Sequence, residues 1–399
     1  MDDLLTERLA ELAVGFGANV QADQIVMVTA ELGREPLARA VAVAAYRAGA
    51  RYVDVTYTDA FVRRAKIEKA GDEAIGYAPP WHVERMKQMG EQRVAVISLE
   101  AAIDPAATDG LDPVRLGADQ SPVRQAYLRL VMERLINWCI IACPTPEWAA
   151  RVHPDLPVDR AFELLSHEIA RVCRLDEDDP VAAWQTRFDR LTEISERLGE
   201  HRFEAIHFSG DGTDLSVGLL PSAEWSCATF TTADGISHHP NLPTEEVFTT
   251  PDPRRTDGVV RSTKPLNIEG TLVTGLTVRF EGGRAVAIDA DGGAEVLRGR
   301  ASRDDGASRL GELALVDGEG RIGALDTVFY STLIDENAAS HIALGSGLGY
   351  LVKDERDKQR VNSSSIHIDF MIGSPEIDVD GVSDDGTRVP VLRAGEWQI

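Results

Sequence analysis

The first half of the chain alternates apolar runs with amphipathic stretches, a pattern that predicts strands alternating with helices. Short runs rich in β-branched residues occupy positions 24–30, 50–57, 93–98 and 138–142. Apolar residues recur at helical spacing over positions 4–16, 35–48, 59–70, 81–89 and 122–137, and again over 158–198 around an acidic turn. Strands that alternate with helices are typical of βαβ units and a mainly parallel sheet.

The pattern changes near residue 203, where short β-prone runs are separated by Gly, Asp and Asn turns. These runs cover residues 204–208, 215–219, 272–280 and 285–289, and Glu281-Gly-Gly-Arg284 has the composition of a two-residue hairpin turn. Short β-prone runs separated by turn residues predict antiparallel or barrel-like β structure. We therefore expect an α/β N-terminal domain over residues 1–204 and an α+β C-terminal domain over residues 205–399.

Composition and charge exclude several classes of partner. The chain has 399 residues, of which 43% are hydrophobic, and a formal net charge of -24. So acidic a protein is a poor match for nucleic acid or an anionic membrane surface, because both are bound through Lys and Arg. There is no run of 18 apolar residues and no apolar N-terminal segment, so we expect a cytoplasmic protein.

Two further kinds of site find no support in the sequence. Residues 29–35, after the first predicted strand, do not match the G-x-G-x-x-G pattern of a nucleotide-binding loop. The four cysteines lack the spacing of a zinc site, and we predict buried free thiols at Cys139, Cys143, Cys173 and Cys227.

The second half places carboxylates and imidazoles inside small or apolar runs. The residues concerned are Glu246, Glu312, His341, His367 and Asp369. Burying a charge in this way is costly unless a metal or another partner compensates. Mixed carboxylate and imidazole ligands suit Zn, Co, Mn or Fe, and several carboxylates allow a bridged two-metal site.

Each member of this set also has a plainer interpretation. Glu245 and Glu246 fit a solvated acidic pair, although neighbours in a strand point to opposite faces, so one of them could point into a cleft. His367 and Asp369, two residues apart, share a strand face and fit a local salt bridge as well as a common metal. His341 fits a core histidine, and Glu312 fits a helix cap. The spacing does not match H-E-x-x-H, so the metal site rests on the set as a whole.

Several long segments resemble the thermophilic aminopeptidase family that includes aminopeptidases T and S. The resemblance covers most of the chain, is strongest after about residue 205, and is carried by residues 241–252, 262–266, 310–316, 329–337, 341–345 and 367–374. The segments at 176–184 and 212–215 are similar to the family as well.

The resemblance implies a dinuclear metal-dependent aminopeptidase that removes N-terminal residues from peptides, usually as a homodimer. Two divalent ions (Zn, Co, Mn or Mg) would activate a water molecule for attack on the scissile carbonyl. Carried over by position, the metal ligands are Glu246, Glu312, His341, His367 and Asp369. Glu245 is the candidate general base of this reaction.

One position departs from the family pattern. The family has a metal-contacting Tyr in a Gly-x-Ala-Tyr run after the first His motif, whereas this chain reads Gly345-Ser-Gly-Leu348-Gly-Tyr350. Leu348 occupies the matching offset and Tyr350 follows two residues later. We keep Tyr350 as a candidate catalytic residue and metal ligand.

Two alternatives remain open at this point. The same scaffold could hold one Fe(II) and act as a ring-cleaving dioxygenase, or act as another hydrolase, because two His and a carboxylate suffice for iron. The displaced Tyr350 also fits a binding protein whose catalytic site has decayed. Five candidate ligands favour a two-metal site over a one-metal site.

Overall fold

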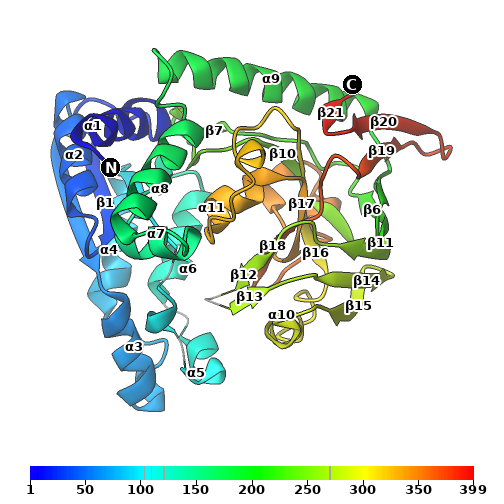
Figure 1. Ribbon diagram of the computed structural model, residues 1–399, viewed down its shortest axis with the longest axis horizontal. Coiled ribbons are helices and arrows are strands. Elements are labelled where there is room, and N and C mark those ends of the chain that lie inside the picture. Colours follow the sequence, from blue (N-terminus) through cyan, green and yellow to red (C-terminus); the bar gives the residue numbers. More distant parts are fainter. Residues whose placement is uncertain (103, 109, 120–121, 269–270) are drawn as a thin grey trace. The chain divides into compact units, whose positions relative to one another are not determined.

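The computed structural model describes residues 1–399 except residues 103, 109, 120–121 and 269–270 (Figure 1). It divides into two compact units. Unit 1 comprises residues 1–184 and 229–243, and unit 2 comprises residues 185–228 and 244–399. The units are interleaved along the chain, whereas the sequence analysis expected one boundary after residue 204. Residues 229–243 return to unit 1 because Asn241 and Leu242 pair with the edge of its sheet.

Unit 1 is built on a parallel sheet in the order β2–β1–β3–β4–β9. The strands are β1 (Ile25–Glu31), β2 (Tyr52–Thr58), β3 (Ala95–Glu100), β4 (Trp138–Ala142) and β9 (Asn241–Leu242). Buried apolar runs such as 26–28 and 95–97 suit a parallel sheet that is covered on both faces. The predicted parallel sheet is therefore present.

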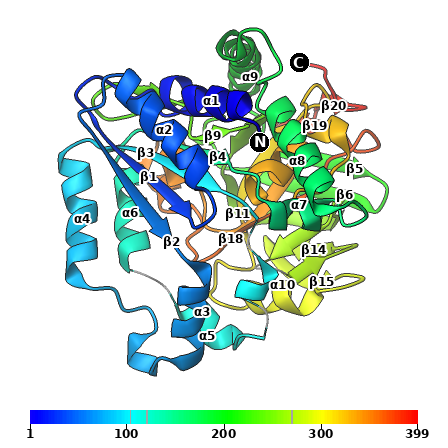
Figure 2. The ribbon, with the colours of Figure 1, turned by 60° about the vertical axis from the view of Figure 1, so that its left-hand side comes forward.

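Helices connect and cover these strands (Figure 2). They are α1 (Asp3–Glu11), α2 (Glu35–Arg47), α3 (Ala60–Lys69), α4 (Pro80–Glu91), α5 (Pro113–Ala118), α6 (Pro122–Met132), α7 (Pro146–Val152) and α8 (Val158–Val172). The next helix, α9 (Pro180–His201), begins at the end of unit 1 and lies mostly in unit 2. Met27 and Val96 of the sheet pack with Met86 and Met89 of α4 and Leu130 of α6 in one apolar cluster. Alternation along β1 turns Val26 and Val28 to the opposite face.

Local signals explain where several helices begin and end. The Asp2 carboxylate accepts a hydrogen bond from the Leu5 amide at 2.8 Å, and Thr145 caps α7 just before Pro146. The predicted helix over 4–16 ends as a π-helical turn, Leu12–Gly17, and the helix predicted over 122–137 ends at Met132. The four cysteines are buried and free, as predicted.

Unit 2 contains a large antiparallel sheet in the order β15–β14–β11–β6–β5–β19–β20–β21. The strands are β5 (Ala205–Gly210), β6 (Thr213–Leu219), β11 (Pro251–Arg261), β14 (Thr277–Glu281), β15 (Arg284–Asp289), β19 (Asp378–Val382), β20 (Arg388–Arg393) and β21 (Glu396–Trp397). Gly282 and Gly283 have φ of 54° and 80°, as the predicted hairpin turn requires. Among the described pairings β15 and β21 are open edges, so the sheet is antiparallel without barrel closure.

A second antiparallel sheet of unit 2 has the order β10–β16–β17–β18. Its strands are β10 (Glu246–Thr249), β16 (Leu310–Val316), β17 (His341–Gly345) and β18 (His367–Met371). β12 (Leu266–Ile268) pairs with β13 (Thr271–Val273), and the run predicted over 272–280 is divided between β13 and β14. The chain turns at Gly275, which has φ of 61°, before β14 begins.

Short elements complete the description. In unit 1, β7 (Phe230–Thr231) pairs with β8 (Ser237–His238). In unit 2, α10 (Ala294–Ala301) packs beside β15, and the remaining turns are η4 (Gly323–Leu325), α11 (Thr332–Asp335), η5 (Glu336–Ala338), η6 (Gly349–Leu351) and α12 (Glu355–Lys358). None of the helices in the described part of the chain combines the length and the apolar character needed to cross a bilayer.

Candidate metal centre

The register of the β10–β16–β17–β18 sheet brings the predicted metal ligands together. Glu312 of β16 and Asp369 of β18 both lie opposite Ala343 of β17. His341 lies two residues before Ala343, and His367 two residues before Asp369. Side chains two residues apart point to the same face of a strand, so these four groups share one face. Opposed residues across antiparallel strands are close enough to interact directly.

Small residues leave room between these side chains. Ala343 separates Glu312 from Asp369, and Ala314 lies opposite His341. The outer strand β10 contributes Glu246, which pairs with Val316 at the end of β16. Residues 312, 314 and 316 of β16 point to one face of the sheet, because side chains two positions apart share a face. Glu246 lies opposite residue 316 and therefore points to the same face as Glu312.

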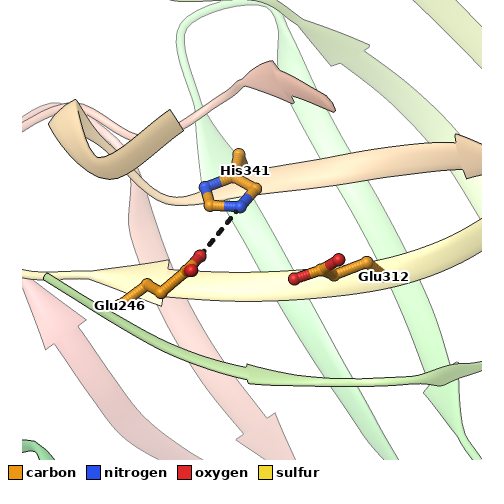
Figure 3. A group of neighbouring side chains, drawn as sticks. All are labelled: Glu246, Glu312 and His341. Atoms are coloured by element: carbon orange, nitrogen blue, oxygen red, sulfur yellow. Dashed lines mark ion pairs between the residues drawn. The ribbon is translucent and has the colours of Figure 1, made fainter. Parts of the chain in front are cut away.

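Three of the groups form what we call the inner group: Glu246, Glu312 and His341. One ligand atom from each lies within 4.8 Å of the other two. Figure 3 shows the two carboxylates and the imidazole turned towards a common space, with His341 Nε2 3.1 Å from Glu246 Oε2. All three residues are buried, and His341 is only 1% exposed.

A second set, the outer group, consists of Glu312, His367 and Asp369. Its ligand atoms also lie within 4.8 Å of one another. His367 Nε2 is 3.1 Å from Glu312 Oε2 and 3.3 Å from Asp369 Oδ1. The His367 side chain is 34% exposed, whereas those of Glu312 and Asp369 are 10% and 8% exposed. Glu312 belongs to both groups and is the residue that they share.

Backbone carbonyls orient both imidazoles. His341 Nδ1 lies 3.2 Å from the Ala339 carbonyl oxygen, and His367 Nδ1 lies 2.9 Å from the Ser346 carbonyl oxygen. A proton on Nδ1 that is donated to a carbonyl leaves the Nε2 lone pair for a metal, an arrangement common around metal-binding histidines. In each case Nε2 is the nitrogen that faces the carboxylates.

Burial and mutual charge shift the pKa values of the imidazoles and carboxylates in this cluster. Burial by itself lowers the pKa of His341, but the nearby carboxylates, above all Glu246, outweigh it and raise the pKa to about 10. The carboxylates of Asp369 and Glu312 likewise raise the pKa of His367. Burial raises the pKa of Glu312. The cluster thus favours positive charge among its carboxylates.

One carboxylate oxygen of the inner group lacks a hydrogen-bond partner. Glu246 Oε2 is buried, and no donor among the described residues is suitably oriented towards it, although His341 Nε2 is nearby. Buried carboxylate oxygens in folded proteins normally accept hydrogen bonds or bind cations. The donor set and this oxygen both fit a divalent metal ion.

Glu245, the predicted general base, has a different environment from Glu246. It is fully buried, and its Oε2 accepts a hydrogen bond from Arg187 Nε at 2.5 Å. It belongs to neither metal-binding group found among the described residues. Opposite orientation of neighbours in an extended segment accounts for this separation.

Tyr350 lies on η6, after β17, and is 40% exposed. Burial and the negative charges of Glu312 and Glu246 raise the pKa of its phenol.

Sequence reasoning missed Glu336, on η5. Burial and the charges of Asp369, Glu246 and Glu312 raise its pKa, while His341 opposes them. Glu336 lines a small pocket with Asp335, Asp369, Leu266 and Met371. The signal was available, because Asp335-Glu-Asn337 places charges after an apolar run, but its position beside the cluster depends on the tertiary fold.

Comparisons with known proteins agree over nearly the whole chain. The family model for thermophilic metalloproteases, M29, matches residues 3–397. Aminopeptidase T of Thermus thermophilus is 41% identical over 401 residues, which cover 98% of each chain. Aminopeptidase 2 of Geobacillus stearothermophilus is 37% identical, covering 98% of this chain and 97% of the relative. The solved structure of wild-type AmpT from Thermus thermophilus matches with a TM-score of 0.92 and 40% identity, covering 99% of both chains. The chain therefore belongs to the M29 family of thermophilic metalloproteases.

Proposed function

We propose that this chain is a metal-dependent aminopeptidase with two divalent cations, one in the inner group and one in the outer group. The observation that carries the proposal is the convergence of five carboxylate and imidazole side chains into two triplets that share Glu312. The names of the relatives, aminopeptidase T and aminopeptidase 2, support the reaction class.

The charges of the proposed ligands suit two divalent ions. Glu246, Glu312 and Asp369 supply three negative charges, and two neutral imidazoles complete the set. Two divalent cations would neutralise this buried excess and replace the protons that His341 and His367 otherwise retain. Oxygen and nitrogen donors of this kind are compatible with Zn, Co or Mn, and less so with Mg, which favours oxygen alone.

The protein's own groups would position the substrate and handle its protons. Bound ions of this kind lower the pKa of water and polarise a carbonyl. Glu245, whose Oε2 accepts a hydrogen bond from Arg187, stays our predicted general base for the attacking water. Tyr350, whose phenol is near Glu312 and Glu246, would add a ligand or a hydrogen bond from the exposed side.

Recognition of a free N-terminus requires a group that binds an ammonium ion. Glu336 lines the pocket that Asp369 also lines and lies outside both triplets. Two bound cations would offset the neighbouring negative charges that help to raise the pKa of Glu336, so its ionised carboxylate would be available for this role. Peptides with a free amino terminus are therefore the proposed substrates.

The alternatives weighed from sequence fare less well. The relatives, which are named aminopeptidases, give no support to a ring-cleaving dioxygenase. A cytoplasmic homodimer remains our proposal for the working form, on the basis of the family resemblance. Sedimentation of the purified protein would test the dimer.

Elemental analysis and turnover test the proposal together. We expect about two divalent ions per chain, and hydrolysis of a leucine anilide that stops with a chelator and returns with added metal. Glu312→Ala removes the shared ligand, so we expect loss of both ions and at least about a 1,000-fold fall in kcat/KM, equivalent to roughly 4 kcal/mol.

His201→Ala serves as the control, because His201 is exposed and stacks on Phe203. This variant should keep both its metal content and its activity. Full activity of wild-type protein without metal, or wild-type turnover by Glu312→Ala, would contradict the proposed function.

A further inference from the structure

Arg187 is a buried arginine of α9 that joins two buried carboxylates. Its Nε donates to Glu245 Oε2 at 2.5 Å, and its Nη1 and Nη2 donate to the two oxygens of Asp317 at 3.0 and 2.8 Å. The arginine side chain is 6% exposed, and both carboxylates are 0% exposed. The charges of Glu245 and Asp317 outweigh burial and raise the pKa of Arg187, so the guanidinium stays charged.

The two carboxylates lie at neighbouring strand ends of the proposed metal sheet. Glu245 immediately precedes Glu246 on β10, and Asp317 immediately follows Val316 on β16. Glu246 and Val316 are themselves paired across the two strands. Arg187 therefore connects β10 and β16 next to the paired residues Glu246 and Val316.

We propose that Arg187 is a positioning residue that holds the Glu246 carboxylate in the inner group by anchoring Glu245 and Asp317. The inference rests on the proposed function, because it takes Glu246 as a metal ligand. Neighbouring side chains in an extended strand point to opposite faces, so fixing Glu245 against Arg187 also fixes the direction of Glu246. A slip of one residue would turn Glu246 away from the cluster.

Two further hydrogen bonds restrict the same strand ends. Trp397 Nε1 on β21 donates to Asp317 Oδ2, and the Glu245 amide donates to Asn337 Oδ1 at 2.6 Å. Asn337 Nδ2 in turn donates to the Leu333 carbonyl oxygen at 3.2 Å. Both ends of the arginine bridge are thus held by other parts of unit 2.

The geometry requires arginine in particular. A planar guanidinium can donate two parallel hydrogen bonds to Asp317 and a third to Glu245, whereas a lysine ammonium is a point charge without this fork. Arg187→Lys therefore keeps the charge but loses the geometry. Supporting residues around metal ligands commonly affect metal affinity by about 10- to 100-fold when they are changed.

Arg187→Lys is the main test, and Arg34→Lys is the matched control. Arg34 is also a buried arginine, 7% exposed, and pairs with Glu31 at 2.8 Å, but it belongs to unit 1 and touches no proposed ligand. Metal dissociation constants, measured by competition with a chromophoric chelator, and thermal unfolding of the metal-free protein are recorded for each variant.

We expect Arg187→Lys to weaken binding of the cation in the inner group by at least about 10-fold. The readout is metal affinity and not kcat, because Arg187 also contacts Glu245, the proposed general base. Arg34→Lys should lower the unfolding temperature without changing metal affinity. Trp397→Phe, which removes only one N–H donor, should weaken the same cation by about 3-fold and provides a milder variant if Arg187→Lys does not fold.

Unchanged metal affinity in Arg187→Lys, or in Trp397→Phe if the first variant does not fold, would overturn the inference while leaving the metal site intact. Equal losses of affinity in Arg187→Lys and Arg34→Lys would also overturn it, since they would reflect stability alone. If the wild-type protein binds no divalent cation, the proposed function has failed first, and the two failures are thereby distinguished.

Discussion

The inner and outer groups use the same kinds of ligand but differ in their exposure to solvent. The inner imidazole, His341, is 1% exposed and lies on a strand flanked on both sides. The outer imidazole, His367, comes from the edge strand β18, and its side chain is 34% exposed. The imidazole from the central strand is therefore enclosed, whereas the imidazole from the edge strand is open to water.

This difference suggests distinct roles for two bound cations. A cation among buried ligands exchanges slowly, because its ligands must move before water or a chelator can reach it. A cation beside His367 can exchange ligands with solvent and substrate, as catalytic metal sites with an open position do. Variants that change one group at a time test this difference.

The largest expected effect comes from removing one imidazole at a time. His341→Ala and His367→Ala should each lose one cation and about 100- to 1,000-fold in kcat/KM, equivalent to roughly 3 to 4 kcal/mol. His341→Ala should also lower the free energy of unfolding by about 2 kcal/mol more than His367→Ala, because it opens a buried network.

Metal content by mass spectrometry and urea unfolding of the metal-free variants would check both expectations. The same unfolding cost for the two variants would show that exposure does not distinguish the groups. Retention of both cations in either variant would remove that histidine from the proposed ligands.

The next effect is a pH dependence that centres on the inner group. In the metal-free protein the pKa of His341 is raised to about 10 from an ordinary value near 6.5. Its contribution to stability is therefore fully present below pH 6.5 and is lost as pH rises towards 10. Metal binding must displace this proton, so metal affinity should increase over the same range.

Chelator competition and urea unfolding between pH 6 and 10 would measure the two trends. His341→Asn should flatten the stability trend, whereas His201→Ala should leave it unchanged. Metal affinity that falls as pH rises through this window would contradict the proton displacement.

The smallest expected effect concerns the substrate pocket beside the outer group. Glu336→Gln keeps the shape of the side chain but removes the charge proposed to bind the α-ammonium. We expect KM for a leucine anilide to rise about 10-fold, equivalent to roughly 1.4 kcal/mol, with two cations still bound. The KM for the same substrate should stay unchanged in Asp305→Asn, an exposed acidic residue paired with Arg284. Loss of a cation from Glu336→Gln would instead make Glu336 a ligand.

The sequence predicts the parallel sheet well because its strands are continuous apolar runs. Val26 to Val28 and Ala95 to Ile97 are buried on both faces, and such runs are recognisable without tertiary information. The 272–280 run was harder, because Gly275 divides it and a single glycine within an apolar run does not reveal a turn. Residues 241–242 gave no signal of joining a distant strand, since two residues are too few for any periodicity.

For the site, sequence predicts the identity of the groups better than their roles. His367 and Asp369 share a face by strand alternation, so their proximity follows from spacing alone. The approach of Glu312 and His341 depends on strand register, and the environment of Glu245 depends on an arginine 58 residues earlier. The neighbourhood of Glu336 was likewise set by tertiary contacts that no local pattern contains.

The late return of Asn241 and Leu242 to the parallel sheet has a consequence for synthesis on the ribosome. The edge of β4 gains its neighbour β9 only after about a hundred further residues have emerged, including much of the material that begins unit 2. During that interval the growing polypeptide carries an unpaired strand edge, a known template for wrong pairings. Vectorial folding of this protein must therefore protect that edge, or delay completing the first sheet, until translation has passed residue 242.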